Sequence, residues 1–446
     1  MTVARLQLDD IQSGVLRPRP TPFVATYIIL RIDDREAGRK LMGRLSEVVA
    51  SAANPESAAR DTWVSASLSY AGLEALGLPQ ASLESFSEPF KQGMAVRANR
   101  LGDVGESSPE HWEKPLGSAE IHVVLTAISP DAPNLERALD RARKAYAEFT
   151  GISAIWRQDC HVLPGEREPF GFKDGISHPA IEGSGIPGTN PHETPSKPGE
   201  FVLGYPDEMS DAPAMPHPSV LGRNGSYIVF RKLYQRVASF RQYLRANATD
   251  SVPEELLAAK MMGRWRSGTP LALSPSTDDT NIGDDPRRNN AFLFKDDDAL
   301  GYKTPLGSHI RRVNARDADI AGVTRIHRMI RRGTAYGPPL PDGMMEDDGV
   351  DRGLMFAFVG ANLARQFEFV QSEWINNSAF FAGPATERDP IAGAGDGSGT
   401  FGIPRRPIRM KLEALPRFVV TRGGEYCFLP SLSALRWLAD GKNYAT

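Results

Sequence analysis

A pattern of strands and helices that occurs twice limits the fold more than any other feature of this sequence. Residues 23–32 (FVATYIILRI) are short, β-branched and aromatic, which predicts a buried strand, and a helical pattern follows over residues 35–50. About 200 residues later the same order returns, with SYIVFRKLY at 226–234 and a helix over 237–247. Each half also contains a second predicted strand–helix pair, at 121–128 with 134–149 and at 354–359 with 363–373.

This order favours two strand–helix–strand–strand–helix–strand units, which is the ferredoxin-like plan. We interpret the repeat as a duplication. The alternative is that two unrelated α+β domains share the order by chance. The order of strands and helices alone does not distinguish the two cases.

The length of 446 residues exceeds one ordinary core and predicts two domains. Residues 182–218 are rich in Gly and Pro, so this stretch cannot be a helix or a central strand. We place the boundary within it, which gives an N-terminal domain of residues 1–205 and a C-terminal domain of residues 206–446.

The charge and the cysteine content argue against several other classes of protein. A net charge of −3 gives no electrostatic reason to expect binding to nucleic acid or to an anionic membrane. Two cysteines, Cys160 and Cys427, form no disulfide framework and fit a reducing compartment. No signal peptide is read at the N-terminus, and the most apolar run, 353–364, is too short to span a bilayer. We therefore expect a cytoplasmic protein.

A histidine within a basic cluster is the first sign of chemistry. His309 is followed by Arg311, Arg312 and Arg316. Nearby cations favour the neutral imidazole, which is the form that binds a metal or a haem iron, and arginines also suit the propionates of haem. The plainer interpretation is a solvated or nucleic-acid-facing patch. A further alternative is tyrosinate ligation through Tyr336, which follows Arg332 in an R-x-x-x-Y pattern.

Three motifs in a fixed order make the chain resemble a known family. They are GFKDG at 171–175, HIRRVNAR at 309–316 and RRGTAYG at 331–337. Together they resemble the dye-decolourising peroxidases, a family of haem enzymes, and most of all its longer bacterial branch without an export signal. Similar stretches at 86–103, 262–271 and 422–436 extend the resemblance over nearly the whole chain. The resemblance implies an α+β fold of two ferredoxin-like domains, each with an antiparallel sheet, and haem held in the C-terminal domain.

The resemblance also implies roles for individual residues. His309 would bind the haem iron, Asp174 would act as the acid–base residue, and Arg331, rather than Arg332, would stabilise charge on the opposite side. From metal-site chemistry, the second nitrogen of His309 should donate to a carboxylate or a carbonyl, and the predicted helix at 363–373 offers Glu368 and Glu373 as carboxylates, with neither preferred.

Further residues would line the cofactor on either side. The family pattern places Gly175, Ile176 and Ser177 on one side, and Asn314, Ala315 and Arg316 on the other, with Arg316 near a propionate. The family usually has proline where this chain has Ala315, so this loop loses some rigidity. His178 is a second departure and is a candidate pocket residue or propionate partner.

The function that the resemblance implies is a haem b peroxidase. It would use hydrogen peroxide to form a ferryl porphyrin radical and then oxidise organic donors, such as dyes and phenolics, one electron at a time. Nucleic acid and membranes are not expected as partners, and an oligomer is left open. The alternative is a haem-binding or iron-release protein without enzyme activity, which would keep His309 but would not need Asp174 or Arg331.

Overall fold

Four antiparallel strands with two covering helices form the first half of the molecule. The computed structural model describes residues 5–53, 62–209, 212–318, 323–381 and 387–441. The strands pair in the order β4-β1-β3-β2, where β1 is Val24–Ile32, β2 Trp63–Leu68, β3 Val123–Ser129 and β4 Ile152–His161. The helices are α2 (Arg35–Val48) and α7 (Ala132–Ala147). This strand order, reached through β-α-β-β-α-β connections, is the ferredoxin-like plan.

The second half repeats the plan with longer connections. Its strands pair in the order β11-β5-β8-β6, and the short β7 also pairs with β8. They are β5 (Ser226–Gln235), β6 (Ile330–Arg331), β7 (Thr334–Tyr336), β8 (Gly353–Gly360) and β11 (Val419–Leu429). Helix α9 (Val237–Asn247) follows β5 as predicted. The predicted duplicated ferredoxin-like fold is therefore confirmed.

The helix after β8 is wound differently from the ordinary α-helix that the periodicity predicts. It consists of two π-helical segments, η6 (Ala364–Glu368) and η7 (Val370–Ile375). Such widened turns are frequent at functional sites. In the first half, α7 begins two residues before the predicted start, because the Asp131 carboxylate caps it by accepting from the Asn134 N–H at 2.8 Å.

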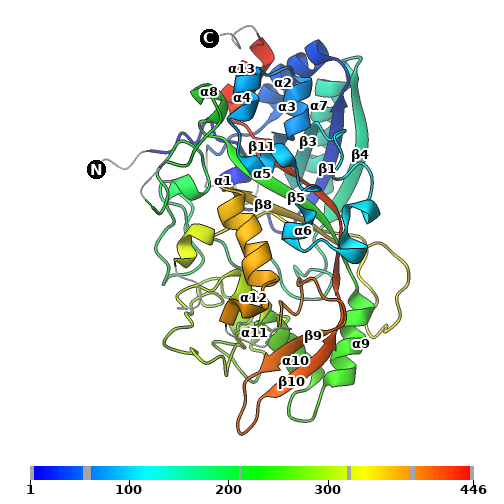
Figure 1. Ribbon diagram of the computed structural model, residues 1–446, viewed down its shortest axis with the longest axis vertical. Helices are drawn as coiled ribbons and strands as arrows, with labels where there is room; N and C mark the ends of the chain where they lie inside the picture. The colour runs from blue at the N-terminus through cyan, green and yellow to red at the C-terminus, as the bar shows by residue number, and fades with distance from the viewer. Residues whose placement is uncertain (1–4, 54–61, 210–211, 319–322, 382–386, 442–446) are drawn as a thin grey trace.

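The two half-sheets are joined into one sheet. Strand β2 pairs with β11, where Leu68 lies opposite Phe428, so the strands of both halves form one nine-stranded sheet (Figure 1). Apolar residues of both halves share one core cluster, which includes Leu125 of β3 and Phe428 of β11. The halves therefore fold against each other, and the boundary at residues 205 and 206 stays a prediction.

Below the sheet lies a second body built from the long connections of the second half. Figure 1 shows α9 to α12 and the β9–β10 hairpin gathered there. The elements are α10 (Glu254–Met262), α11 (Thr280–Gly283), α12 (His309–Val313), β9 (Gly399–Ile403) and β10 (Met410–Leu415). The remaining α-helices are α1 (Ser13–Leu16), α3 (Tyr70–Ala75), α4 (Gln80–Glu84), α5 (Glu88–Gln92), α6 (Ala98–Leu101), α8 (Ser219–Gly222) and α13 (Leu432–Asp440). Within the described ranges, no helix combines the length and the apolar character needed to cross a membrane.

Candidate active site

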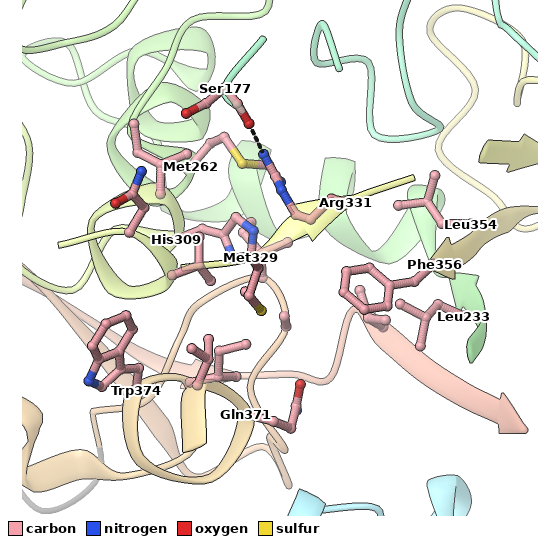
Figure 2. Close-up of a pocket in the computed structure, with 18 of the residues that line it drawn as sticks. Ser177, Leu233, Met262, His309, Met329, Arg331, Leu354, Phe356, Gln371 and Trp374 are labelled. Carbon is pink, nitrogen blue, oxygen red and sulfur yellow. Dashed lines mark hydrogen bonds between the residues drawn. The ribbon is translucent and has the colours of Figure 1, made fainter. Parts of the chain in front are cut away.

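One cavity between the sheet and the lower body collects residues that are far apart in the sequence. Its walls come from β5, β8 and β11 on one side, and from α12, η7 and the loop around residue 174 on the others. Figure 2 shows Leu233, Leu354 and Phe356 together at the sheet side. The predicted site residues that line it are Asp174, Gly175, Ile176, Ser177, His309, Asn314, Arg316 and Arg331.

Ala315 is the predicted lining residue that is placed elsewhere. Its side chain is fully buried in a small apolar cluster with Phe292 and Phe294, behind the loop whose neighbours Asn314 and Arg316 reach the cavity. The alanine therefore fills the core under the loop, and its side chain is not among those that line the cavity.

His309 enters the cavity from the first position of α12. Its Nδ1 donates to the Asp389 carboxylate at 2.9 Å, and that aspartate is fully buried. Desolvation raises the pKa of Asp389, but the neighbouring His309 and the hydrogen bond from it outweigh this and leave the pKa below its ordinary value. Because Nδ1 carries the hydrogen in this bond, Nε2 keeps the lone pair that a metal needs.

The prediction that Glu368 or Glu373 holds His309 is wrong. The Glu368 carboxylate instead pairs with the guanidinium of Arg97 and accepts from the Tyr426 hydroxyl at 2.9 Å. Glu373 accepts from the Asn377 amide at 3.0 Å. The partner, Asp389, lies 80 residues after His309, in a segment with no recognisable motif, so no signal in the sequence identified it.

The arginines next to His309 serve the fold and do not form a solvated patch. Arg311 donates to the Thr304 carbonyl at 2.8 Å and pairs with Asp298 at 3.2 Å. Arg312 donates to the carbonyl of Trp374 at 2.6 Å. Both side chains are essentially fully buried. They therefore fasten the short helix α12, and with it His309, to the surrounding loops.

Asp174 lies in a loop whose shape is stabilised by hydrogen bonds to the Glu168 carboxylate. The Glu168 carboxylate accepts from the N–H groups of Phe170 and Phe172 at 3.0 and 2.9 Å, and from the Gln235 amide at 2.7 Å. Gly171 and Gly175 have φ values of +95° and +79°, which side chains rarely adopt. The two glycines of GFKDG thus allow the tight loop that turns Asp174 towards the cavity.

Arg331 reaches the same cavity from β6. Its guanidinium donates to the Ser177 carbonyl at 3.2 Å (Figure 2). Successive side chains of a strand point to opposite faces, and Arg332 accordingly points away and donates to the Val15 carbonyl at 3.3 Å. Because this segment forms a strand, Arg331, not Arg332, lies at the cavity.

A residue that the sequence did not single out completes this side. The guanidinium of Arg19, from the segment before β1, pairs with the Asp174 carboxylate at 3.0 Å. Desolvation raises the pKa of Asp174, but the charges of Arg19 and then Arg331, with a hydrogen bond from the Gly175 N–H, outweigh it and lower the pKa below its ordinary value. The carboxylate is therefore ionised in mildly acidic solution. Burial, and then the charges of Arg332, Arg331 and Arg19, keep the pKa of His178 well below its usual value.

The cavity is also lined by two arginines whose positive charges an anionic cofactor would neutralise. Arg264 and Arg316 line it, and both bond mainly to carbonyl groups and to the Asn290 amide oxygen. Burial, and for Arg264 the neighbouring arginines, lower the pKa of Arg264 well below its usual value, while burial lowers the pKa of Arg316 to about 10. Arg264 forms no ion pair with a described residue, and Arg316 meets the Glu193 carboxylate only at 3.9 Å, a carboxylate that also pairs with Arg328. These two cations can therefore still pair with an anionic group. Together with the Nε2 of His309, they fit a haem with its propionates.

Tyr336 is not arranged as a metal ligand. Its hydroxyl donates to the Asp351 carboxylate at 3.1 Å, and the ring is buried outside the cavity lining. Desolvation and Asp351 raise the pKa of this hydroxyl, which opposes the tyrosinate form.

Comparison with known proteins finds relatives that match most of the chain. No family model matches the sequence. The chain is 34% identical to peroxidase 2 of Mycetinis scorodonius over 403 residues, which cover 84% of this chain and 76% of that protein. It is 30% identical to a multifunctional dye peroxidase of an Amycolatopsis strain, with 98% and 96% covered. A solved dye-decolourising peroxidase in complex with 2,6-dimethoxyphenol superposes with a TM-score of 0.84 at 28% identity, covering 97% of this chain and all of that one.

The identities extend over most of both chains, and the fold is shared throughout. The relatives are enzymes of one kind, in fungi and in a bacterium. The chain therefore belongs to the dye-decolourising peroxidases, a family of haem enzymes.

Proposed function

We propose that this peroxidase binds haem b through the Nε2 of His309 and reduces hydrogen peroxide with Asp174 as acid–base residue and Arg331 as charge stabiliser. The observation that carries the proposal is one cavity lined by an imidazole, a carboxylate and a guanidinium from three distant parts of the chain. Bound haem would take up the two oxidising equivalents that peroxide delivers and pass them on to organic donors, which are oxidised.

The protein's own residues would manage the proton and the charge. Ionised Asp174 takes the proton from one oxygen of hydrogen peroxide and delivers it to the other, so that the departing oxygen leaves as water. Arg331 holds a fixed positive charge at the cavity, where it stabilises the negative charge that develops on that oxygen. Apolar side chains of the sheet, Leu354 and Phe356 among them, line the same cavity and limit the water that competes for these groups.

Haem b, which is held without covalent bonds to the protein, fits the two cysteines of this chain. Covalent attachment of a c-type haem uses a C-x-x-C-H motif, and Cys160 and Cys427 stand far apart in the sequence. Both are buried and free, and neither is among the residues that line the cavity. Binding would therefore rest on His309 and on the arginines near the propionates.

The donors would be phenolics and dyes. This part of the proposal is supported by the solved relative that was obtained in complex with 2,6-dimethoxyphenol.

Replacing His309 by alanine should abolish or strongly weaken haem binding, because the iron loses the nitrogen that Asp389 orients. The measurement is the haem content and the Soret band of the purified variant after addition of haemin. His327→Ala is the matched control, because His327 also lines the cavity. Its Nδ1 hydrogen-bonds to the Arg365 carbonyl, and its ring stacks on Phe369 with 3.9 Å between the ring centroids. That variant should keep its haem. An unchanged Soret band in His309→Ala would refute the assignment.

A further inference from the structure

Arg19 links three parts of the candidate site. One arm of its guanidinium pairs with the Asp174 carboxylate at 3.0 Å, and another donates to the carbonyl of Gly333. The group also lies over the Phe23 ring, 4.5 Å from its centroid. Gly333 follows Arg331 in the connection from β6 to β7, so Arg19 joins the Asp174 loop to the strand that carries Arg331.

The contacts hold the Arg19 side chain in one place. It is only 12% exposed, while the Asp174 side chain keeps 34% exposure and lines the cavity. A Cβ atom added to Gly175 would come within 2.9 Å of the Arg19 guanidinium, so the glycine lets the cation approach the loop backbone closely. An ion pair this enclosed is screened less by salt than a surface pair.

The two cations near Asp174 are engaged differently. Arg19 forms the ion pair with the carboxylate, whereas Arg331 donates to the Ser177 carbonyl and lines the cavity. The other titratable groups that face Asp174 are Glu168 of the same loop, whose pKa is raised by burial, and His178, whose pKa burial lowers well below its usual value. Neither of these supplies positive charge, so the two arginines balance the carboxylate.

We infer that Arg19 is a positioning residue that keeps Asp174 ionised and aimed at the cavity, and so leaves the charge of Arg331 for the departing peroxide oxygen. This inference rests on the proposed function of Asp174 and deepens it. The segment before the first strand thereby becomes part of the active site, and Asp174 works between two arginines instead of beside one.

The test is a titration of Asp174 in the resting haem-loaded protein, without peroxide or donor. Infrared difference spectra against pH follow the carbonyl band of the protonated acid, which is assigned by its loss in Asp174→Asn. The variants are Arg19→Gln and Arg19→Met, which both remove the charge, and Arg19→Lys, which keeps it. Arg17→Gln is the matched control, because Arg17 comes from the same segment and is also buried, but donates to the Ala53 carbonyl.

Both charge-removing variants should protonate Asp174 at higher pH than the wild type, and Arg19→Lys should restore most of the difference. Arg17→Gln should leave the midpoint unchanged. On the acid side of the titration, the rate of the reaction with peroxide should fall about tenfold for each pH unit by which the midpoint rises. An unchanged midpoint in Arg19→Gln and Arg19→Met would overturn the inference.

The outcomes separate this inference from the proposed function. If Asp174→Asn reacted with peroxide at the wild-type rate, the proposed role of Asp174 would fail, while the titration would still report whether Arg19 controls its charge. If Asp174→Asn were slow and the Arg19 variants titrated like the wild type, only the role of Arg19 would fail.

Discussion

Replacing Asp174 by asparagine should leave haem bound and slow the reaction with hydrogen peroxide by about 10²- to 10⁴-fold, the usual contribution of a positioned acid–base group. Asparagine has nearly the same shape, so the loop held by Glu168 should keep its form. It cannot accept a proton from one oxygen and return it to the other. The loss should therefore appear in the rate and not in haem content.

The measurement is a stopped-flow series in which haem absorbance is followed against peroxide concentration in the absence of a donor. Asp284→Asn is a suitable control, because Asp284 is an exposed aspartate paired with Lys173, the residue just before Asp174. That variant should react like the wild type. Equal rates for Asp174→Asn and the wild type would show that another group carries the proton.

Replacing Arg331 by leucine should also preserve haem and should reduce the same rate by about 10²- to 10³-fold, the effect of removing one charge-stabilising donor, about 3–4 kcal/mol. Arg19 cannot replace the lost positive charge, because its guanidinium is engaged by the Asp174 carboxylate and the Gly333 carbonyl. Stopped-flow rates at a pH where Asp174 is ionised isolate this effect.

The matched control for Arg331 is its neighbour. Arg332 is equally basic but donates to the Val15 carbonyl on the other side of β6. Arg332→Leu should therefore lower the melting temperature and leave the rate of the reaction with peroxide close to that of the wild type. If Arg332→Leu reacted slowly with peroxide and Arg331→Leu reacted at the wild-type rate, the assignment of Arg331 as the cavity-facing arginine would be wrong.

The fold and much of the site could be predicted because the signals were local. Residues 23–32 and 226–234 read as strands since both are central strands, buried on two faces. Strand β4 was missed because it lies at the sheet edge and its burial follows no regular alternation. The pairing of β2 with β11 was also out of reach, because it joins residues about 360 positions apart through a single register contact, Leu68 with Phe428.

The site residues that the sequence missed act through tertiary contacts. Asp389 and Arg19 belong to no motif, and each is identified only by the side chain that it contacts in the folded chain, His309 for Asp389 and Asp174 for Arg19. Glu368 and Glu373 were better candidates by position on a predicted helix. The π-helical winding of that helix and the pairing of Glu368 with Arg97 direct them elsewhere. Motifs pointed to the residues that we propose react, and only the structure identified Asp389 and Arg19 as their partners.

The pH dependence of the reaction with peroxide tests the central claim most directly, namely that an aspartate held between two arginines is the base of this enzyme. Because the pKa of Asp174 lies below its ordinary value, the base stays ionised as the pH falls through the range in which a histidine, with a reference pKa near 6.5, would already be protonated. The bimolecular rate constant, measured without donor from about pH 3 to about pH 8, should hold down to about pH 4 and fall only below it. Asp174→Asn should lack that acid limb. A wild-type rate that collapses below about pH 6, or a profile that Asp174→Asn leaves unchanged, would contradict the account.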